Sequence, residues 1–194
     1  MKSSPTVRSQ LLLIDTCVVI EAHRLHVWES LLSQCHIVVP ETVVGEAILV
    51  ARGFDDISLR LEQQIKEGLI QSPSLNASAL AIVSQRCPHF PGKMDPGEQE
   101  CLAFLLRDAS DITLICSSDA VVFRFLGWLQ KADRGLSLEE VLRTVGLGRP
   151  VSRKLSKKFR EYWTQKGFQE ALQRGFINPS NPSAPPLERD PPAR

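Results

Sequence analysis

The sequence predicts an α/β domain built on a mainly parallel sheet. Short, continuously apolar runs such as Leu11–Ile14 and Ile112–Cys116 are typical of strands that are buried on both faces. Stretches with helical periodicity separate these runs, as expected where crossover helices join parallel strands. The 194 residues are enough for one such domain with an appendage.

The strands and helices are expected in a regular alternation. Strands are expected over 11–14, 36–39, 69–70 and 112–116. Helices are expected over about 18–32, 41–51, 55–67, 76–85, 95–107, 120–131 and 137–145. Pro40 marks a helix start and Gly68 a helix end, while Ser137 and Glu140 have the spacing of a capping box.

The net charge of +1 conceals two unlike parts of the chain. Residues 1–148 carry 13 basic and 18 acidic side chains, whereas residues 149–194 carry 10 basic and 4 acidic ones. We therefore expect a folded domain over 1–148 and a basic amphipathic helical extension over 149–178. Residues 179–194 are rich in proline, and we expect them to form a disordered tail.

Several classes of protein are excluded by the composition. No apolar run approaches the ~20 residues of a membrane span, and residues 1–10 lack the apolar stretch of a signal peptide. The five cysteines are odd in number and never fall as Cys-x-x-Cys, which argues against a disulfide scaffold or a cysteine zinc site. We expect a cytoplasmic protein with reduced thiols and no membrane partner.

Four acidic residues form the candidate site. Asp15 and Asp119 each follow a predicted buried strand, and Glu46 and Glu98 lie on helices that enter the same region. Functional groups collect where the strands of an open parallel sheet end and helices begin. Clustered carboxylates need cations to remain ionised, and their hard oxygens suit Mg²⁺ or Mn²⁺. A water held by such a metal can attack a phosphodiester.

Each acid also has a structural interpretation. Asp119 has the position of an N-cap for the next helix, and Asp95 with Glu98 has the spacing of a capping box. For Asp95 we favour the cap, whereas for Glu98 both interpretations stay open. Asp15 is the hardest to explain structurally, because a carboxylate next to a fully apolar strand needs a partner. Glu100 points to another side of its helix, and we expect it to be solvated.

Taken in order, four segments resemble the PIN domain. They are Leu-Leu-Ile-Asp15-Thr16-Cys17-Val-Val-Ile, Val-Val-Gly-Glu46-Ala, Pro-Gly-Glu98-Gln-Glu-Cys-Leu-Ala and Ile-Cys-Ser117-Ser118-Asp119. The PIN domain is the fold of many small metal-dependent ribonucleases, including toxins of the VapBC toxin–antitoxin type. The resemblance covers roughly residues 10–145 and implies a Rossmann-like α/β/α sandwich with the acids at the carboxyl edge of its sheet.

The resemblance also implies an activity and partners. It makes the chain a Mg²⁺- or Mn²⁺-dependent endoribonuclease, with RNA as substrate and, for a toxin, an antitoxin protein and a homodimer as further partners. Cys17 stands where the family often has Asn or Ser. The implied catalytic and metal-binding acids are Asp15, Glu46, Glu98 and Asp119, and the auxiliary site residues are Thr16, Ser117 and Ser118.

The basic extension is a second candidate surface. Its cations could contact an RNA backbone, and Tyr162 and Trp163 could stack bases. The structural interpretation, which we favour for the aromatic side chains, is a helix that docks Leu155, Phe159, Tyr162 and Trp163 on the domain, and it is compatible with RNA contacts by the cations. The alternative function is a non-catalytic RNA- or protein-binding module on a PIN-like fold. A phosphatase with Asp15 as its nucleophile is disfavoured, because such enzymes have a second Asp two residues later, where this chain has Cys17. The candidate nucleic-acid contacts are Arg153, Lys154, Lys157, Lys158 and Arg160.

Overall fold

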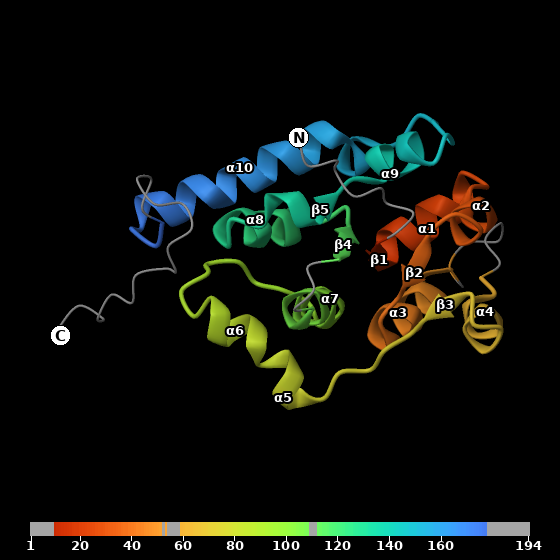
Figure 1. The fold of residues 1–194 in the computed structure, drawn as a ribbon, viewed down its shortest axis with the longest axis horizontal. Coiled ribbons are helices and arrows are strands. Elements are labelled where there is room, and N and C mark those ends of the chain that lie inside the picture. The colour runs from red at the N-terminus through yellow and green to blue at the C-terminus, as the bar shows by residue number, and fades with distance from the viewer. Residues whose placement is uncertain (1–9, 52, 54–58, 109–111, 178–194) are drawn as a thin grey trace.

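The computed structural model describes residues 10–51, 53, 59–108 and 112–177. Within this part of the chain, five strands form one parallel sheet, and helices lie on both sides of it (Figure 1). The strand order is β3-β2-β1-β4-β5. The predicted α/β class and the parallel sheet are confirmed. The strands are β1 (Leu11–Ile14), β2 (His36–Val38), β3 (Ile70–Gln71), β4 (Thr113–Cys116) and β5 (Gly135–Leu136).

The helices follow the predicted alternation with the strands. Two of them, α3 and α7, carry candidate acids, and Figure 1 shows α10 lying along α8. The helices are α1 (Thr16–Arg24), α2 (Trp28–Leu32), α3 (Glu41–Ala51), α4 (Leu61–Lys66), α5 (Ala77–Leu80), α6 (Ile82–Arg86), α7 (Pro96–Arg107), α8 (Ala120–Trp128), α9 (Leu138–Thr144) and α10 (Lys157–Gln173), with 3-10 turns η2 (Ala132–Arg134) and η3 (Arg153–Leu155).

Strand β1 is the centre of the sheet. It pairs with β2 on one side and with β4 on the other, and Leu12 and Leu13 are fully buried. Ile14 is aligned with Cys116 of β4, so the two strands end side by side. The continuously apolar sequence of β1 is explained by this position, because both faces of a central parallel strand are covered.

Several helices end on a residue with a left-handed backbone. Gly68, Gly146 and Gly175 have φ angles of 74°, 77° and 73° just after α4, α9 and α10. His26 and Gln130 adopt the same conformation, with φ angles of 54° and 58°, although neither is glycine. Because no glycine marks these two positions, the prediction of one helix over 18–32 is wrong, and the helix predicted to reach residue 131 ends at Trp128.

Other differences from the prediction are small. The helix predicted over 76–85 is interrupted near Ala81, which caps α5 and precedes α6. The helix predicted over 55–67 begins at Leu61, and residues 55–58 lie outside the described residues. Strand β5 was not predicted, because its two residues, Gly135 and Leu136, form no apolar run of the kind that indicated the strand at 69–70.

The basic extension shares the core of the domain. Leu155 and Ala171 are buried with the core residues of the body, and Phe159 and Trp163 are partly buried against it. The predicted docking is therefore confirmed for Leu155, Phe159 and Trp163, whereas it is wrong for Tyr162, which is 62% exposed. The division into segments at 148 and 178 stays a prediction, and the proposed disordered tail lies outside the described residues.

Helices α8 and α10 approach one another through two glycines. A Cβ atom at Gly127 would collide with the backbone of Thr164, and a Cβ atom at Gly167 would collide with the backbone of Arg124. An ion pair between Arg124 and Glu170 (2.7 Å) joins the same two helices. The absence of side chains at the crossing thus sets the spacing of α8 and α10.

Two further observations concern the whole described chain. None of its described helices combines the length and the apolar character that crossing a membrane requires. The five cysteines form no disulfide; Cys17 is exposed and the other four are buried. Burial raises the pKa of Cys101 and Cys116 well above the usual value, which suits their place in the core.

The glycine crossing gives a first prediction. Gly167→Ala should destabilise the protein by about 3 kcal/mol, because the added methyl group collides with backbone that cannot turn away. The measurement is urea unfolding at neutral pH. Gly45→Ala is the control, since a Cβ atom at this exposed helical position meets nothing within 4 Å and should stabilise the protein by up to ~1 kcal/mol. Equal midpoints for Gly167→Ala and wild type would contradict the close crossing.

Candidate functional site

The sheet has one point at which its strand order reverses. From β1 the chain proceeds outwards to β2 and β3, and from β4 it proceeds in the other direction to β5. Ligands of open parallel sheets bind in the crevice at such a point, outside the carboxyl ends of the strands. Asp15 follows β1 and Ser117, Ser118 and Asp119 follow β4, so these four residues stand at the crevice.

Asp15 joins the ends of the two central strands. Its Oδ2 atom accepts hydrogen bonds from Ser117 Oγ (2.5 Å) and Ser118 N (3.0 Å), and its Oδ1 atom accepts one from Val18 N (2.9 Å) as the N-cap of α1. Burial raises the pKa of Asp15, the three hydrogen bonds oppose this increase, and the charge of Asp119 adds to it. The partner that a carboxylate needs after an apolar strand is therefore this set of donors.

Ser117 holds both strand-end acids. Its buried hydroxyl donates to Asp15 and accepts from Asp119 N (2.9 Å). The Asp119 carboxylate in turn accepts a hydrogen bond from Val121 N (2.9 Å) and caps α8, as its structural interpretation predicted. Ser117 and Ser118, the predicted auxiliary residues, thus both contact Asp15.

Glu46 reaches the crevice from α3. Its Oε2 atom accepts a hydrogen bond from Thr16 Oγ1 (2.8 Å). Glu46 also lies so close to Gly97 of α7 that a Cβ atom there would come within 2.8 Å of Oε2. Gly97 therefore leaves the space that the Glu46 carboxylate occupies. In the sequence, the Pro-Gly pair at the start of α7 was the only indication of this role.

Glu98 has the capping role considered for it, and metal binding by its carboxyl group stays a prediction. It forms a capping box with Asp95, in which Asp95 N donates to Glu98 Oε2 and Glu98 N donates to Asp95 Oδ1, each at 2.8 Å. Its carboxyl group also interacts with that of Asp119. Burial raises the pKa of Glu98 to about 8; the hydrogen bond from Asp95 N opposes this increase, and the charges of Asp119 and Asp95 add to it. Without a cation Glu98 is therefore mostly protonated at neutral pH.

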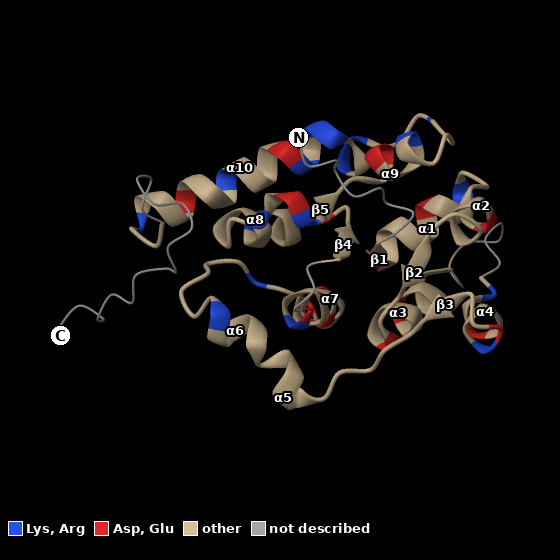
Figure 2. Cartoon of the chain, viewed as in Figure 1, with Lys and Arg blue, Asp and Glu red and all other residues tan. Residues whose placement is uncertain are grey.

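One small cavity is lined by all four predicted acids. Its volume is about 60 Å³, room for an ion with a few waters. We call this site the acidic cavity. Figure 2 shows acidic residues on α3 and α7, the helices that carry Glu46 and Glu98. The lining residues are Asp15, Thr16, Cys17, Val43, Glu46, Asp95, Gly97, Glu98, Ser118 and Asp119.

The acidic cavity has the donor chemistry of a divalent-cation site. In the described residues, no three His, Cys, Asp or Glu side chains are grouped so as to hold a metal ion. Asp15, Glu46 and Glu98 instead accept the protein hydrogen bonds described above. Oxygens of four carboxylates are nevertheless the ligands that Mg²⁺ and Mn²⁺ prefer, and a cation would take the place of the proton held by Glu98.

Glu100 differs from its prediction. We expected a solvated side chain, but Glu100 is only 4% exposed and accepts hydrogen bonds from Thr42 N (3.0 Å) and Leu75 N (3.2 Å). Thr42 lies in the first turn of α3, where backbone N–H groups lack helical partners. Glu100 therefore links α7 to α3, and no sequence pattern indicated this contact between distant segments.

The predicted nucleic-acid contacts fall into two groups. Arg160 is engaged in an ion pair with Glu140 at 2.7 and 2.8 Å, so its guanidinium group secures α10 to α9. Lys157 pairs with Glu161 at 3.5 Å. Arg153, Lys154 and Lys158 are exposed. The structure thus gives Arg160 a structural role, and it leaves the other four cations, Lys157 included, at the surface near the start of α10.

Lys154 stands out among these cations because of its neighbour. Cys17 lies at the mouth of the acidic cavity. The surrounding protein and the Asp15 carboxylate raise the pKa of the Cys17 thiol, whereas the Lys154 ammonium lowers it. The charge of Lys154 therefore acts, as the smallest of several influences, on a residue that lines the acidic cavity, although the two residues are far apart in the chain.

Comparison with known proteins adds no relative to this picture. No protein-family model matches the sequence, and no curated protein matches it. The geometry of the acidic cavity therefore has to support any proposal of function.

The Glu98–Asp119 contact gives a second prediction. A carboxyl group whose pKa is raised by folding stabilises the protein below its ordinary value, 4.5 for Glu98, and this contribution is lost as the pH rises towards about 8. Asp119→Asn removes one charge and should reduce this loss. In EDTA, its unfolding midpoint should rise relative to wild type between pH 5 and pH 8. Asp133→Asn, at an exposed acid in η2, is the control and should show no such trend.

Proposed function

We propose that the protein is a Mg²⁺- or Mn²⁺-dependent endoribonuclease of the PIN type on a Rossmann-like α/β/α fold. The observation that carries this proposal is the acidic cavity, in which Asp15, Glu46, Glu98 and Asp119 come together at the strand-order reversal of a parallel sheet. All four come from the segments that resemble the PIN domain.

These four acids would hold the metal, and other residues would position them. When bound, the ion would lower the pKa of a coordinated water for attack on a phosphodiester and offset charge on the leaving oxygen. Ser117 fixes Asp15 and the backbone of Asp119. Thr16 orients Glu46, and the backbone of Asp95 orients Glu98. Such surrounding hydrogen bonds limit how far ligands must move.

The cations of the extension would attract the substrate. An acidic cavity repels RNA at a distance, so basic groups beside it increase the rate of encounter. Figure 2 shows basic residues gathered at the start of α10. We assign to Lys154 the contact with an RNA phosphate near the cavity, because its charge already acts on Cys17. A toxin role, an antitoxin partner and a homodimer stay predictions.

The third prediction tests the catalytic proposal. Wild type should cleave labelled single-stranded RNA in Mg²⁺ or Mn²⁺ and not in EDTA. Glu46→Gln keeps an acceptor for Thr16 but removes the charge, and it should slow cleavage by about 100-fold or more. Glu41→Gln, at an exposed acid on the same helix, should cleave at the wild-type rate. RNA binding without any metal-dependent cleavage would instead indicate the non-catalytic binding module.

The fourth prediction concerns Lys154. Lys154→Ala should weaken binding of single-stranded RNA about fivefold at moderate salt and lower the slope of log Kd against log salt by roughly one. The measurement is fluorescence anisotropy in Mg²⁺ in the Glu46→Gln background. Lys66→Ala, at an exposed lysine on α4, serves as the charge-matched control. Equal salt slopes for the two variants would remove Lys154 from the RNA contact.

A further inference from the structure

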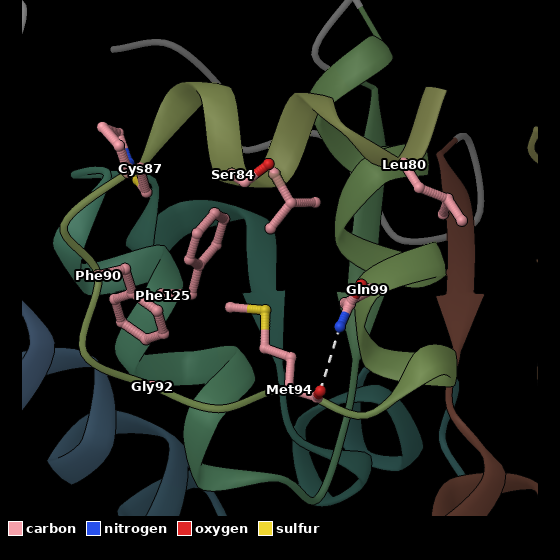
Figure 3. Close-up of a pocket in the computed structure, with 10 residues that line it drawn as sticks. Leu80, Ser84, Cys87, Phe90, Gly92, Met94, Gln99 and Phe125 are labelled. Atoms are coloured by element: carbon pink, nitrogen blue, oxygen red, sulfur yellow. Dashed lines mark hydrogen bonds between the residues drawn. The ribbon is translucent and has the colours of Figure 1, made fainter. Parts of the chain in front are cut away.

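A second cavity lies beside the acidic one. Its volume is about 250 Å³, below the ~300–1,000 Å³ of pockets for drug-sized ligands. We call it the apolar cavity. It is enclosed by α5, α6, the loop between α6 and α7, and parts of α7 and α8 (Figure 3). The lining residues are Leu80, Val83, Ser84, Cys87, Pro88, Phe90, Gly92, Met94, Gln99 and Phe125.

The two cavities share one short segment of the chain. In the segment that opens α7, Asp95, Gly97 and Glu98 line the acidic cavity, whereas Met94 and Gln99 line the apolar one. A group in the apolar cavity would therefore lie against the same first turn of α7 as a group held by the acids. Neighbouring positions of this kind suit two consecutive parts of one substrate.

The walls of the apolar cavity suit a flat aromatic ring. Figure 3 shows Met94 reaching towards Phe125, with Phe90 on one side of the view and Gln99 on the other. Phe90 is held edge-on to Phe125, with ring centroids 5.2 Å apart, and edge-on to Trp128 at 5.6 Å. Aromatic and thioether groups of this kind stack on heteroaromatic rings.

Polar and basic groups border these apolar walls. The side-chain amide of Gln99 donates to Met94 O (3.1 Å), and the hydroxyl of Ser84 donates to Ala81 O (3.0 Å). Each keeps an acceptor oxygen for the polar edge of a ring. Arg86 at the end of α6 and Lys93 in the following loop are exposed basic residues, and each is next in sequence to residues that line the cavity. Their charges complement a phosphodiester backbone.

We propose that the apolar cavity binds one unpaired nucleobase of the RNA, next to the phosphodiester that the acidic cavity would cleave. This inference rests on the proposed ribonuclease function and gives it a base preference. The ring packs against the partly exposed side chains of Phe90 and Met94, and its polar edge reaches Gln99 and Ser84, while the buried Phe125 supports Phe90 from behind. The base is unpaired, because a paired base presents neither its face nor its hydrogen-bonding edge to a protein.

The experiment measures base discrimination by binding, independently of cleavage. The full-length Glu46→Gln protein is titrated in Mg²⁺ with fluorescent hexanucleotides of adenosine, cytidine, guanosine or uridine. The best and the worst of the four should differ about tenfold in affinity. Two further changes test the cavity itself: Ser84→Trp fills it from its exposed rim, and Met94→Ala removes one wall. Each should bring the four affinities within about twofold of one another.

A matched control separates filling from surface change. Ser33→Trp alters another exposed serine, whose hydroxyl also donates to a carbonyl three residues back (2.9 Å), and it should keep the full discrimination. Thermal unfolding verifies that all variants fold. Equal binding of the four hexanucleotides by the unfilled protein, no binding at all, or discrimination that survives both cavity variants would overturn the proposal. If base discrimination depends on the cavity but the wild-type protein does not cleave RNA, only the proposed ribonuclease function would be refuted.

Discussion

The hydrogen bonds to Asp15 are the contacts on which the rest of the site depends. Strand β1 ends in a carboxylate that accepts from the chain after β4 and from the first turn of α1. These bonds fix the separation of the two central strand ends and the direction of the helix that follows. Asp119 is in turn placed through Ser117, so the two acids of the strand ends share one support.

The cluster of acids and the basic extension are parts of one arrangement. The body has more acidic than basic residues, and part of this excess is concentrated in a cavity where the pKa of Glu98 is raised to about 8. Helix α10 is packed so closely on α8 that the extension is held to the body by backbone contact. The extension is thereby joined to the body through its core, rather than by surface ion pairs, which are usually weak.

The sequence predicted the features that a periodic pattern or a polar residue at the end of a strand can indicate. The buried strands, most helices and the four acids of the cavity follow from apolar runs, caps and the rule for parallel sheets. The helix ends near His26 and Gln130 were missed because these residues adopt the left-handed backbone conformation in which glycine is usual, so no glycine marked them in the sequence. Glu100, Gly97 and Lys154 act through partners distant in sequence, and a single chain without its fold carries no mark of such contacts.

Glu100 fixes the position of α7 relative to α3. Its carboxylate on α7 accepts from the first turn of α3, so the helices that carry Glu46 and Glu98 are joined one turn away from the cavity. Any sliding of one helix against the other would leave a buried charge without its donors, which is costly. The Glu100 contact therefore keeps the Glu46 and Glu98 side chains at a fixed separation. An ion bound in the cavity has to fit this separation, since the two helices resist moving relative to one another.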